Sequence, residues 1–221
     1  MQLDDTLENY LRRVADFHGC FQKAPGIIIG CYMVEYAMEA LGDIRGTLNA
    51  VVETRVCLSD CVQIMTGCTL GNKHLKLHDH IGKYACTLYD RDTKRGVRVY
   101  LDLAKLDAGK FPELRRFHTR QRDPRVLTDM AIRKASGQRV VDEFMSVKRG
   151  VLSVEPVRVK LPAKDAMLPS VPCRTCGEPF LTTAKPDEAL CGPCGGTSYY
   201  EAAAAAGDDE RAAPVAARCT P

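Results

Sequence analysis

Four cysteines near the C-terminal end form the clearest chemical pattern in the chain. Cys173 and Cys176 make one C-x2-C pair, and Cys191 and Cys194 make a second pair after fourteen intervening residues. Zinc binds four thiolates in a tetrahedron, and a two-residue spacing lets one tight turn aim both sulfurs at one ion. A glycine follows each pair and permits the positive φ of such turns. The pattern predicts a structural zinc site in preference to two redox pairs or four unrelated thiols.

The segment after Cys194 decides the type of zinc finger. Thr197 and Ser198 can cap a helix, and a run of helix formers follows them. A helix at this point would make a treble-clef-like finger, and its absence would leave a zinc ribbon. Because a closed four-cysteine site has no open coordination position, we expect this zinc to stabilise structure or support binding, not catalysis.

A second set of sulfur and imidazole groups lies in the first seventy residues. His18 and Cys20 fall in a loop between two expected helices, where side chains can converge. Cys57 lies just ahead of a helix, where the helix dipole favours a thiolate, and Cys68 lies in a turn. Together they are a candidate mixed His/Cys metal site, or a catalytic site with Cys57 as nucleophile and His18 as general base. The alternative is that Cys57 and Cys68 are small buried apolar residues.

Three histidines alternate with other residues along the expected strand 73–79 and just beyond it. His74, His78 and His80 would share one face of that strand. They are candidates for the wall of a metal or polar substrate site, but a solvated polar strand face is the favoured interpretation.

The elements that must position these groups predict an α+β fold. Helical spacing of apolar residues indicates helices near 7–17, 25–42 and after 59, and over parts of 112–149. Strands are expected at 47–54, 73–79, 83–90, 96–102 and 151–159. We therefore expect a mixed core domain at 1–158, a proline-rich linker at 159–172, the four-cysteine finger at 173–200 and a flexible tail at 201–221.

Composition limits the class of protein. The chain has 221 residues, a formal charge of +3 and 45% hydrophobic residues, which excludes disorder throughout. The small net charge gives no support to nucleic-acid or membrane binding. An acidic N-terminus without an apolar signal region, and no apolar run long enough for a bilayer, predict a cytoplasmic protein with reduced thiols and no membrane contact.

Beyond these patterns, the chain resembles the FmdE family of formylmethanofuran dehydrogenase subunits. The matching residues are Phe17-His18-Gly19, Pro25-Gly26, Glu53-Thr54, Cys57, Asp60, Gln63, Thr66-Gly67-Cys68-Thr69, Gly71-Asn72, Asp79 and Gly82-Lys83. One departure is Cys20, which stands where the family has a second histidine. Cysteine is still a competent ligand, and a better one for soft ions.

The resemblance implies an α+β core that forms a homodimer, with a cleft that holds a metal or a reactive thiol, and a C-terminal zinc finger. Asn72, Asp79 and Lys83 would orient substrate or ligands. The implied role is a subunit or accessory protein of a formylmethanofuran dehydrogenase-like molybdenum or tungsten enzyme, with turnover by this chain itself left open. The alternative is a non-catalytic sensor or regulatory protein whose finger docks on protein or nucleic acid.

Overall fold

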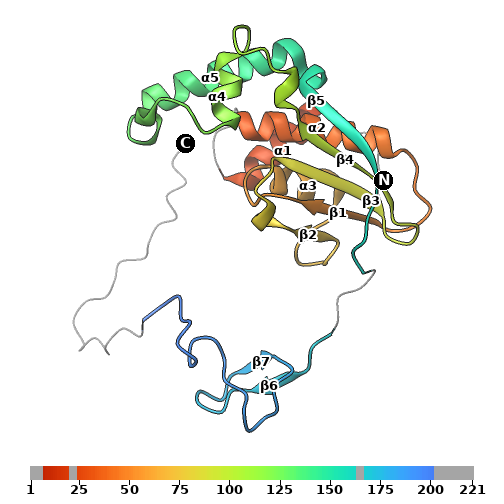
Figure 1. Ribbon diagram of the computed structural model, residues 1–221, viewed down its shortest axis with the longest axis vertical. Coiled ribbons are helices and arrows are strands. Elements are labelled where there is room, and N and C mark those ends of the chain that lie inside the picture. Colours follow the sequence, from red (N-terminus) through yellow and green to blue (C-terminus); the bar gives the residue numbers. More distant parts are fainter. Residues whose placement is uncertain (1–6, 20–23, 163–166, 202–221) are drawn as a thin grey trace. The chain divides into compact units, whose positions relative to one another are not determined.

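The structure is a computed structural model that describes residues 7–19, 24–162 and 167–201 (Figure 1). The chain divides into two compact units, with the boundary between Leu161 and Pro162. The larger unit carries the mixed sheet and the helices, and the smaller unit carries the two cysteine pairs. Each unit is described by itself below.

The larger unit is built on a five-stranded sheet with the order β2-β1-β3-β4-β5. Its strands are β1 (Leu48–Val52), β2 (Leu75–Leu77), β3 (Ala85–Asp90), β4 (Arg95–Leu101) and β5 (Leu152–Arg158). β1 and β2 run parallel, and the other neighbours are antiparallel. Every residue of the central strand β3 is buried, as expected for a strand covered on both faces. The predicted α+β fold is confirmed.

Five α-helices accompany the sheet among the described residues, with four short 3-10 turns. The helices are α1 (Leu7–His18), α2 (Pro25–Leu41), α3 (Leu58–Thr66), α4 (Pro112–His118) and α5 (Met130–Val147). The turns are η1 (Asp79–Ile81), η2 (Leu103–Lys105), η3 (Pro124–Leu127) and η4 (Lys148–Val151). α2 packs on β3 and β4, α1 packs on α2 and α3, and α4 packs on α5.

Helix α2 is the centre of the hydrophobic core. Pro25 opens the helix and Gly42 caps its end, as the sequence predicts. Between them the helix is apolar on most of its surface, and Ile27, Ile29 and Val34 are fully buried. A helix that is hydrophobic all round must be enclosed, so α2 fixes where the other helices and the sheet lie.

The expected strand 73–79 is shorter in the structure. Only Leu75–Leu77 pair with β1, and Asp79 begins the turn η1. The chain turns here because Gly82 adopts a left-handed conformation and its N–H donates to the Asp79 carbonyl. The three histidines therefore do not share one strand face. The rings of His78 and His80 lie 5.6 Å apart on either side of Asp79.

The smaller unit contains a two-stranded antiparallel sheet of β6 (Ser170–Pro172) and β7 (Pro179–Leu181). β6 lies within the segment expected to be linker, so the ordered finger begins before its first cysteine. No helix follows Cys194 in residues 195–201, and the arrangement is ribbon-like. The alanine run from 202 onward, with the rest of the expected tail, lies outside the described residues.

A search of the described helices for a membrane span finds no helix with the necessary length and apolar character.

Candidate functional site

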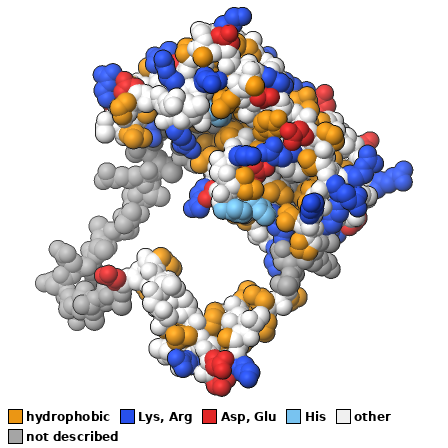
Figure 2. All heavy atoms as spheres, viewed as in Figure 1, with side chains coloured by type: hydrophobic (Ala, Val, Ile, Leu, Met, Phe, Trp, Pro, Cys, Tyr) orange, Lys and Arg blue, Asp and Glu red, His pale blue; other side chains and the backbone are white. Residues whose placement is uncertain are grey.

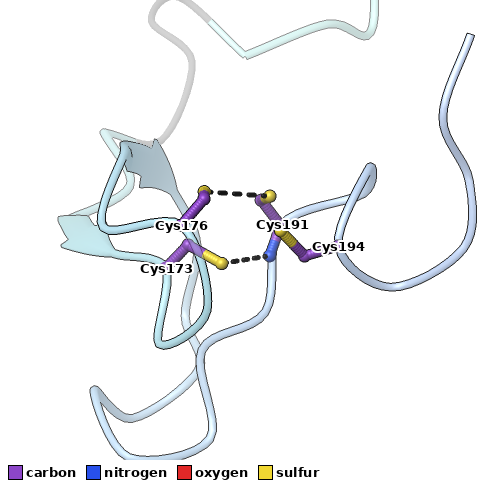
Figure 3. A group of neighbouring side chains, drawn as sticks. All are labelled: Cys173, Cys176, Cys191 and Cys194. Carbon is purple, nitrogen blue, oxygen red and sulfur yellow. Dashed lines mark hydrogen bonds between the residues drawn. The ribbon is translucent and has the colours of Figure 1, made fainter. Parts of the chain in front are cut away.

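The four cysteines of the smaller unit converge on one point (Figure 3). The sulfur atoms of Cys173, Cys176, Cys191 and Cys194 all lie within 4.8 Å of one another. Each pair is held by a tight turn, in which Gly177 N donates to Cys173 O at 2.9 Å and Gly195 N donates to Cys191 O at 2.8 Å. The cluster can therefore hold a metal ion such as zinc, as the spacing predicts.

The glycines of the two turns act at different positions. Gly177, directly after Cys176, has the expected positive φ of 77°. In the second turn the positive φ of 89° belongs to Gly196, one residue later than expected. Both turns thus use a glycine to reverse the chain around the sulfurs.

Electrostatics in the cluster favour a bound cation. Backbone N–H groups, first that of Cys191, lower the pKa of Cys173 to about 6. The pKa of Cys194 rises to about 12, first because its thiol hydrogen-bonds with Cys191 and then through burial and the other thiols. Four thiolates at this separation repel one another, so a divalent cation is what allows all four to ionise.

A second cluster lies in the larger unit, where His18 joins Cys57 and Asp60. His18 is the last residue of α1, Cys57 immediately precedes α3, and Asp60 lies in the first turn of α3. His18 Nδ1 and Asp60 Oδ2 are 2.5 Å apart, and His18 Nε2 lies 3.7 Å from Cys57 Sγ. An Nδ1–H donated to the carboxylate leaves Nε2 as the basic nitrogen that faces the thiol. The structure thus brings together residues separated by 39 positions in the chain.

The Cys57 thiol lies against the first turn of α2. A Cβ atom added to Gly26 would stand only 2.9 Å from Cys57 Sγ, so this position requires glycine. Tyr84 completes the wall by donating its hydroxyl to Gly26 O at 2.5 Å. Burial, and then the neighbouring thiols, raise the pKa of Tyr84 well above its usual range. The amino-terminal ends of α2 and α3 both approach this sulfur, and helix N-termini favour a thiolate.

Cys68 does not join this cluster. Its side chain is 1% exposed, and its thiol donates to Leu48 O on β1 at 3.4 Å. Burial raises the pKa of Cys68. The turn at Gly67 points the thiol inward, because Cys68 N is held by Thr66 Oγ1 at 3.1 Å. Cys68 is therefore a packing residue of the core, as the alternative interpretation of the sequence had it.

The expected four-ligand core site is accordingly not assembled in the part of the chain that the structure describes. Within these residues, the finger cysteines are the only group of three or more Cys, His, Asp or Glu whose ligand atoms all lie within 4.8 Å of one another. Cys20, the remaining predicted ligand, lies outside the described residues.

Two of the three residues expected to bind substrate instead stabilise loops around the site. Asp79 accepts hydrogen bonds from Arg55 N at 2.9 Å and Arg55 Nε at 2.6 Å, and this pairing lowers the pKa of Asp79. The contact ties η1 to the chain just before Cys57. Asn72 bridges the turn after Cys68, with Oδ1 on Thr69 N at 2.9 Å and Nδ2 on Gly67 O at 2.8 Å.

Lys83, the third of these residues, is exposed in the segment between η1 and β3. A substrate role for Lys83, Asp79 and Asn72 remains a prediction. The residue that sequence reasoning missed as a site residue is Asp60. Its position three residues after Cys57, one helical turn away, was the signal that could have found it.

Comparison with known proteins gives relatives for both units. The family model described as "FmdE, Molybdenum formylmethanofuran dehydrogenase operon" matches residues 17–150. A crystal structure of an FmdE-like protein of tungsten formylmethanofuran dehydrogenase, from Syntrophus aciditrophicus, is 32% identical. That match covers 90% of this chain and 97% of the other, with a TM-score of 0.71.

A curated relative from Archaeoglobus fulgidus is described as a probable S-adenosyl-L-methionine-binding protein. It is 29% identical over 212 residues, which cover 88% of this chain and 54% of that protein. The chain thus spans about half the length of this relative. The family match and the similar solved structure agree with each other, and with the motif around Cys57. The chain belongs to the FmdE family.

Proposed function

We propose that this chain is a metal-binding subunit or accessory protein of a formylmethanofuran dehydrogenase-like molybdenum or tungsten enzyme. Its core would bind a soft divalent cation through His18 and Cys57, and its finger would hold a structural zinc. Family membership supports the enzyme system. The observation that supports the core site is the approach of His18 Nε2 to within 3.7 Å of Cys57 Sγ.

The separation of these two atoms fits a shared metal ion. Zinc bonds of about 2.0 Å to nitrogen and about 2.3 Å to sulfur place two ligands of a tetrahedron about 3.5 Å apart. The observed 3.7 Å is close to that value. Asp60 on the other ring nitrogen is the arrangement that orients a ligating imidazole and raises its basicity.

The proposed ligand set leaves room for a further group. Cys20, two residues after His18, is the proposed third protein ligand. Three protein ligands and one open position are typical of zinc sites that act on or sense a small molecule. When bound, such an ion would act as a Lewis acid, while His18 and Asp60 hold the proton balance at Nδ1.

The same three groups would also suit thiol chemistry without a metal. His18 can accept the proton of Cys57 at Nε2, and Asp60 would stabilise the resulting imidazolium. The thiolate would then attack an electrophilic carbon or sulfur atom. This version uses the same residues, and the experiment below separates it from metal binding.

The test counts metal ions per chain by elemental analysis of the full-length protein, after loading with zinc and desalting. We expect two equivalents in the wild type and one in the His18→Ala/Cys57→Ser double variant. Cys68→Ala is the matched control and should keep both, because its thiol faces β1. One equivalent in the wild type, or two in the double variant, would contradict core metal binding.

Thiol chemistry would instead give one zinc in the wild type and a Cys57 that reacts with iodoacetamide at a rate lowered by His18→Ala. The name of the Archaeoglobus relative, with its reference to S-adenosyl-L-methionine, is not part of the proposal, because nearly half of that protein has no counterpart in this chain.

A second candidate function is that of a non-catalytic binding protein that docks through the finger. The supporting observation is a pair of exposed aromatic residues after the second cysteine pair, Tyr199 at 94% and Tyr200 at 53% exposure. Tyrosines that present a ring to solvent are frequent in binding surfaces. Deletion of all residues after Leu161 should then abolish capture of the partner enzyme and leave the core folded.

We also propose that the core forms a homodimer, as the family resemblance implies. Light scattering of the full-length protein should give twice the mass of 24.4 kDa. A mass of one chain at micromolar concentration would contradict the dimer.

A further inference from the structure

Positive charge is concentrated in one segment of the larger unit. Residues 110–139 contain nine Lys or Arg and three Asp or Glu, a formal charge of +6 in a chain whose total is +3. The rest of the chain is therefore net negative. In space-filling view, several basic side chains lie over α4 and α5, which belong to this segment (Figure 2). Such an asymmetry points to an anionic partner for this segment alone.

The same segment encloses a cavity of about 420 Å³. It lies between α4, the loop that follows α4, η3 and the first half of α5. Its polar lining includes Glu113, Arg116, Asp123, Arg125, Ser136 and Arg139, and an apolar wall is added by α5. This volume is within the range of sites for small molecules.

The floor of the cavity is held in place by a buried serine. Ser136 is 2% exposed, donates to Glu113 Oε2 at 2.9 Å and accepts from Arg122 Nε at 2.9 Å. Arg122 is itself stacked over the ring of Phe117. These contacts fix the Glu113 carboxylate before any ligand arrives, so the charged rim above it is pre-organised.

Glu113 balances only part of the positive charge on the rim. Arg116 Nη1 donates to Glu113 Oε1 at 3.0 Å, and Arg139 Nη2 stands 3.7 Å from Glu113 Oε2. One carboxylate therefore faces two guanidinium groups. Their side chains are 54% and 57% exposed, so their remaining N–H groups reach the open cavity.

Arg125 supplies the third guanidinium group. Its Nε and Nη2 atoms are engaged by the Asp123 carboxylate, which leaves Nη1 directed away from that pair. Arginine N–H groups match the oxygens of a phosphate in bidentate geometry and stay charged at any physiological pH. Three arginines against two carboxylates leave the lining with net positive charge, and a phosphate would complete the balance.

We propose that this cavity binds a small molecule through a phosphate group, which Arg116, Arg125 and Arg139 hold at the rim. Ile132 and Ala135 on α5 offer an apolar wall for the rest of that molecule. The proposal does not depend on a metal ion in the core, because none of these residues touches the Cys57 cluster.

The test follows amide chemical shifts of the full-length, zinc-loaded protein during titration with phenyl phosphate, benzoate and phenol. We expect phenyl phosphate to shift the resonances of 112–139 with saturation, and benzoate and phenol to bind at least tenfold more weakly. Arg125→Ala and Arg139→Ala should each raise the Kd for phenyl phosphate about tenfold. Arg158→Ala removes an equally exposed charge on β5 and should leave the Kd unchanged.

Several results would overturn the proposal. These are an unchanged Kd in Arg139→Ala, saturable shifts that map elsewhere, no saturable shift at all, and benzoate binding as tight as phenyl phosphate. Single-stranded oligonucleotides whose affinity rises with length would show that the segment is an open nucleic-acid surface instead. The arginine side chains are more than half exposed, so the variants should keep the wild-type spectrum outside the segment.

Discussion

The finger and the core use cysteine in opposite ways. Among the described residues of the finger, the buried side chains are Val171, Cys173 and Ala189. The core instead encloses whole apolar faces of α2 and β3, and its buried thiols, such as Cys61 and Cys86, lie among hydrocarbon side chains. A segment with so few buried apolar groups cannot fold on hydrophobic burial alone.

The difference shows when a thiol indicates a site. In the finger, four thiols cluster because no hydrocarbon side chain fills the centre, and an ion can take that place. In the core, most thiols behave as small apolar residues, and burial raises the pKa of Cys86 to about 12. Cys57 differs from them because it is only half-buried and faces an imidazole. Sulfur indicates chemistry where the fold leaves it without hydrocarbon neighbours.

The largest expected effect tests the finger. Cys176→Ser should unfold residues 167–201 and leave the core intact, because a structural zinc supplies about 10 kcal/mol or more of folding free energy in such modules. Amide resonances of the finger would collapse to unfolded positions, while those of 24–162 keep their dispersion. Arg174→Ser, in the same turn but not a ligand, is the control. A finger that stays folded in Cys176→Ser would erase the contrast between the two regions.

The next effect tests how the core resists without metal. Glu53 and Arg98 form a bidentate ion pair at 2.6 and 2.9 Å, with the Glu53 side chain 9% exposed. Glu53→Gln leaves a largely buried guanidinium without its carboxylate and should cost about 3 kcal/mol in urea unfolding. Glu155→Gln removes a half-exposed partner of the same arginine and should cost less than about 1 kcal/mol. Equal costs would show that burial does not control this pair.

Acid should weaken the core through His118. Burial, and then the charge of Arg120, lower the pKa of His118 from 6.5 to about 4. Between these values the unfolded chain binds a proton that the folded chain does not, so stability falls as pH drops through this window, by about 3 kcal/mol at most. Thermal unfolding of Cys176→Ser isolates the core, and His118→Gln should flatten its pH dependence relative to the exposed His80→Gln. An unchanged slope in His118→Gln would refute the assignment.

The smallest effect compares two core thiols directly. In the presence of a chelator, Cys57 should react with iodoacetamide about 100-fold faster than Cys68, because Cys68 must await local opening of the core. Peptide mass spectrometry over a time course measures both rates in one sample. Similar rates would mean that Cys57 is no more available than a packing residue.

Local patterns predicted those features that depend on neighbouring residues in the chain. Pro25 and Gly42 set the ends of α2, and the C-x2-C spacing set the ligand pairs of the finger. Features that depend on distant contacts were not predictable in this way. The length of β2 follows from pairing with β1, and the inward direction of Cys68 follows from the turn at Gly67.

The core site shows both cases. His18 and Cys57 were found because each stands at an element boundary, where a side chain is free to point into a site. Asp60 was missed because a carboxylate in the first turn of a helix has an ordinary local role beside the helix dipole. Only the packing of α1 against α3 reveals that it faces His18.

The central claim is that His18 and Cys57 share a metal ion, and anomalous X-ray scattering at the zinc edge from crystals of the zinc-loaded protein tests it most directly. We expect two anomalous peaks per chain, one among the four finger sulfurs and one within bonding distance of both His18 Nε2 and Cys57 Sγ. A single peak, confined to the finger, would contradict it.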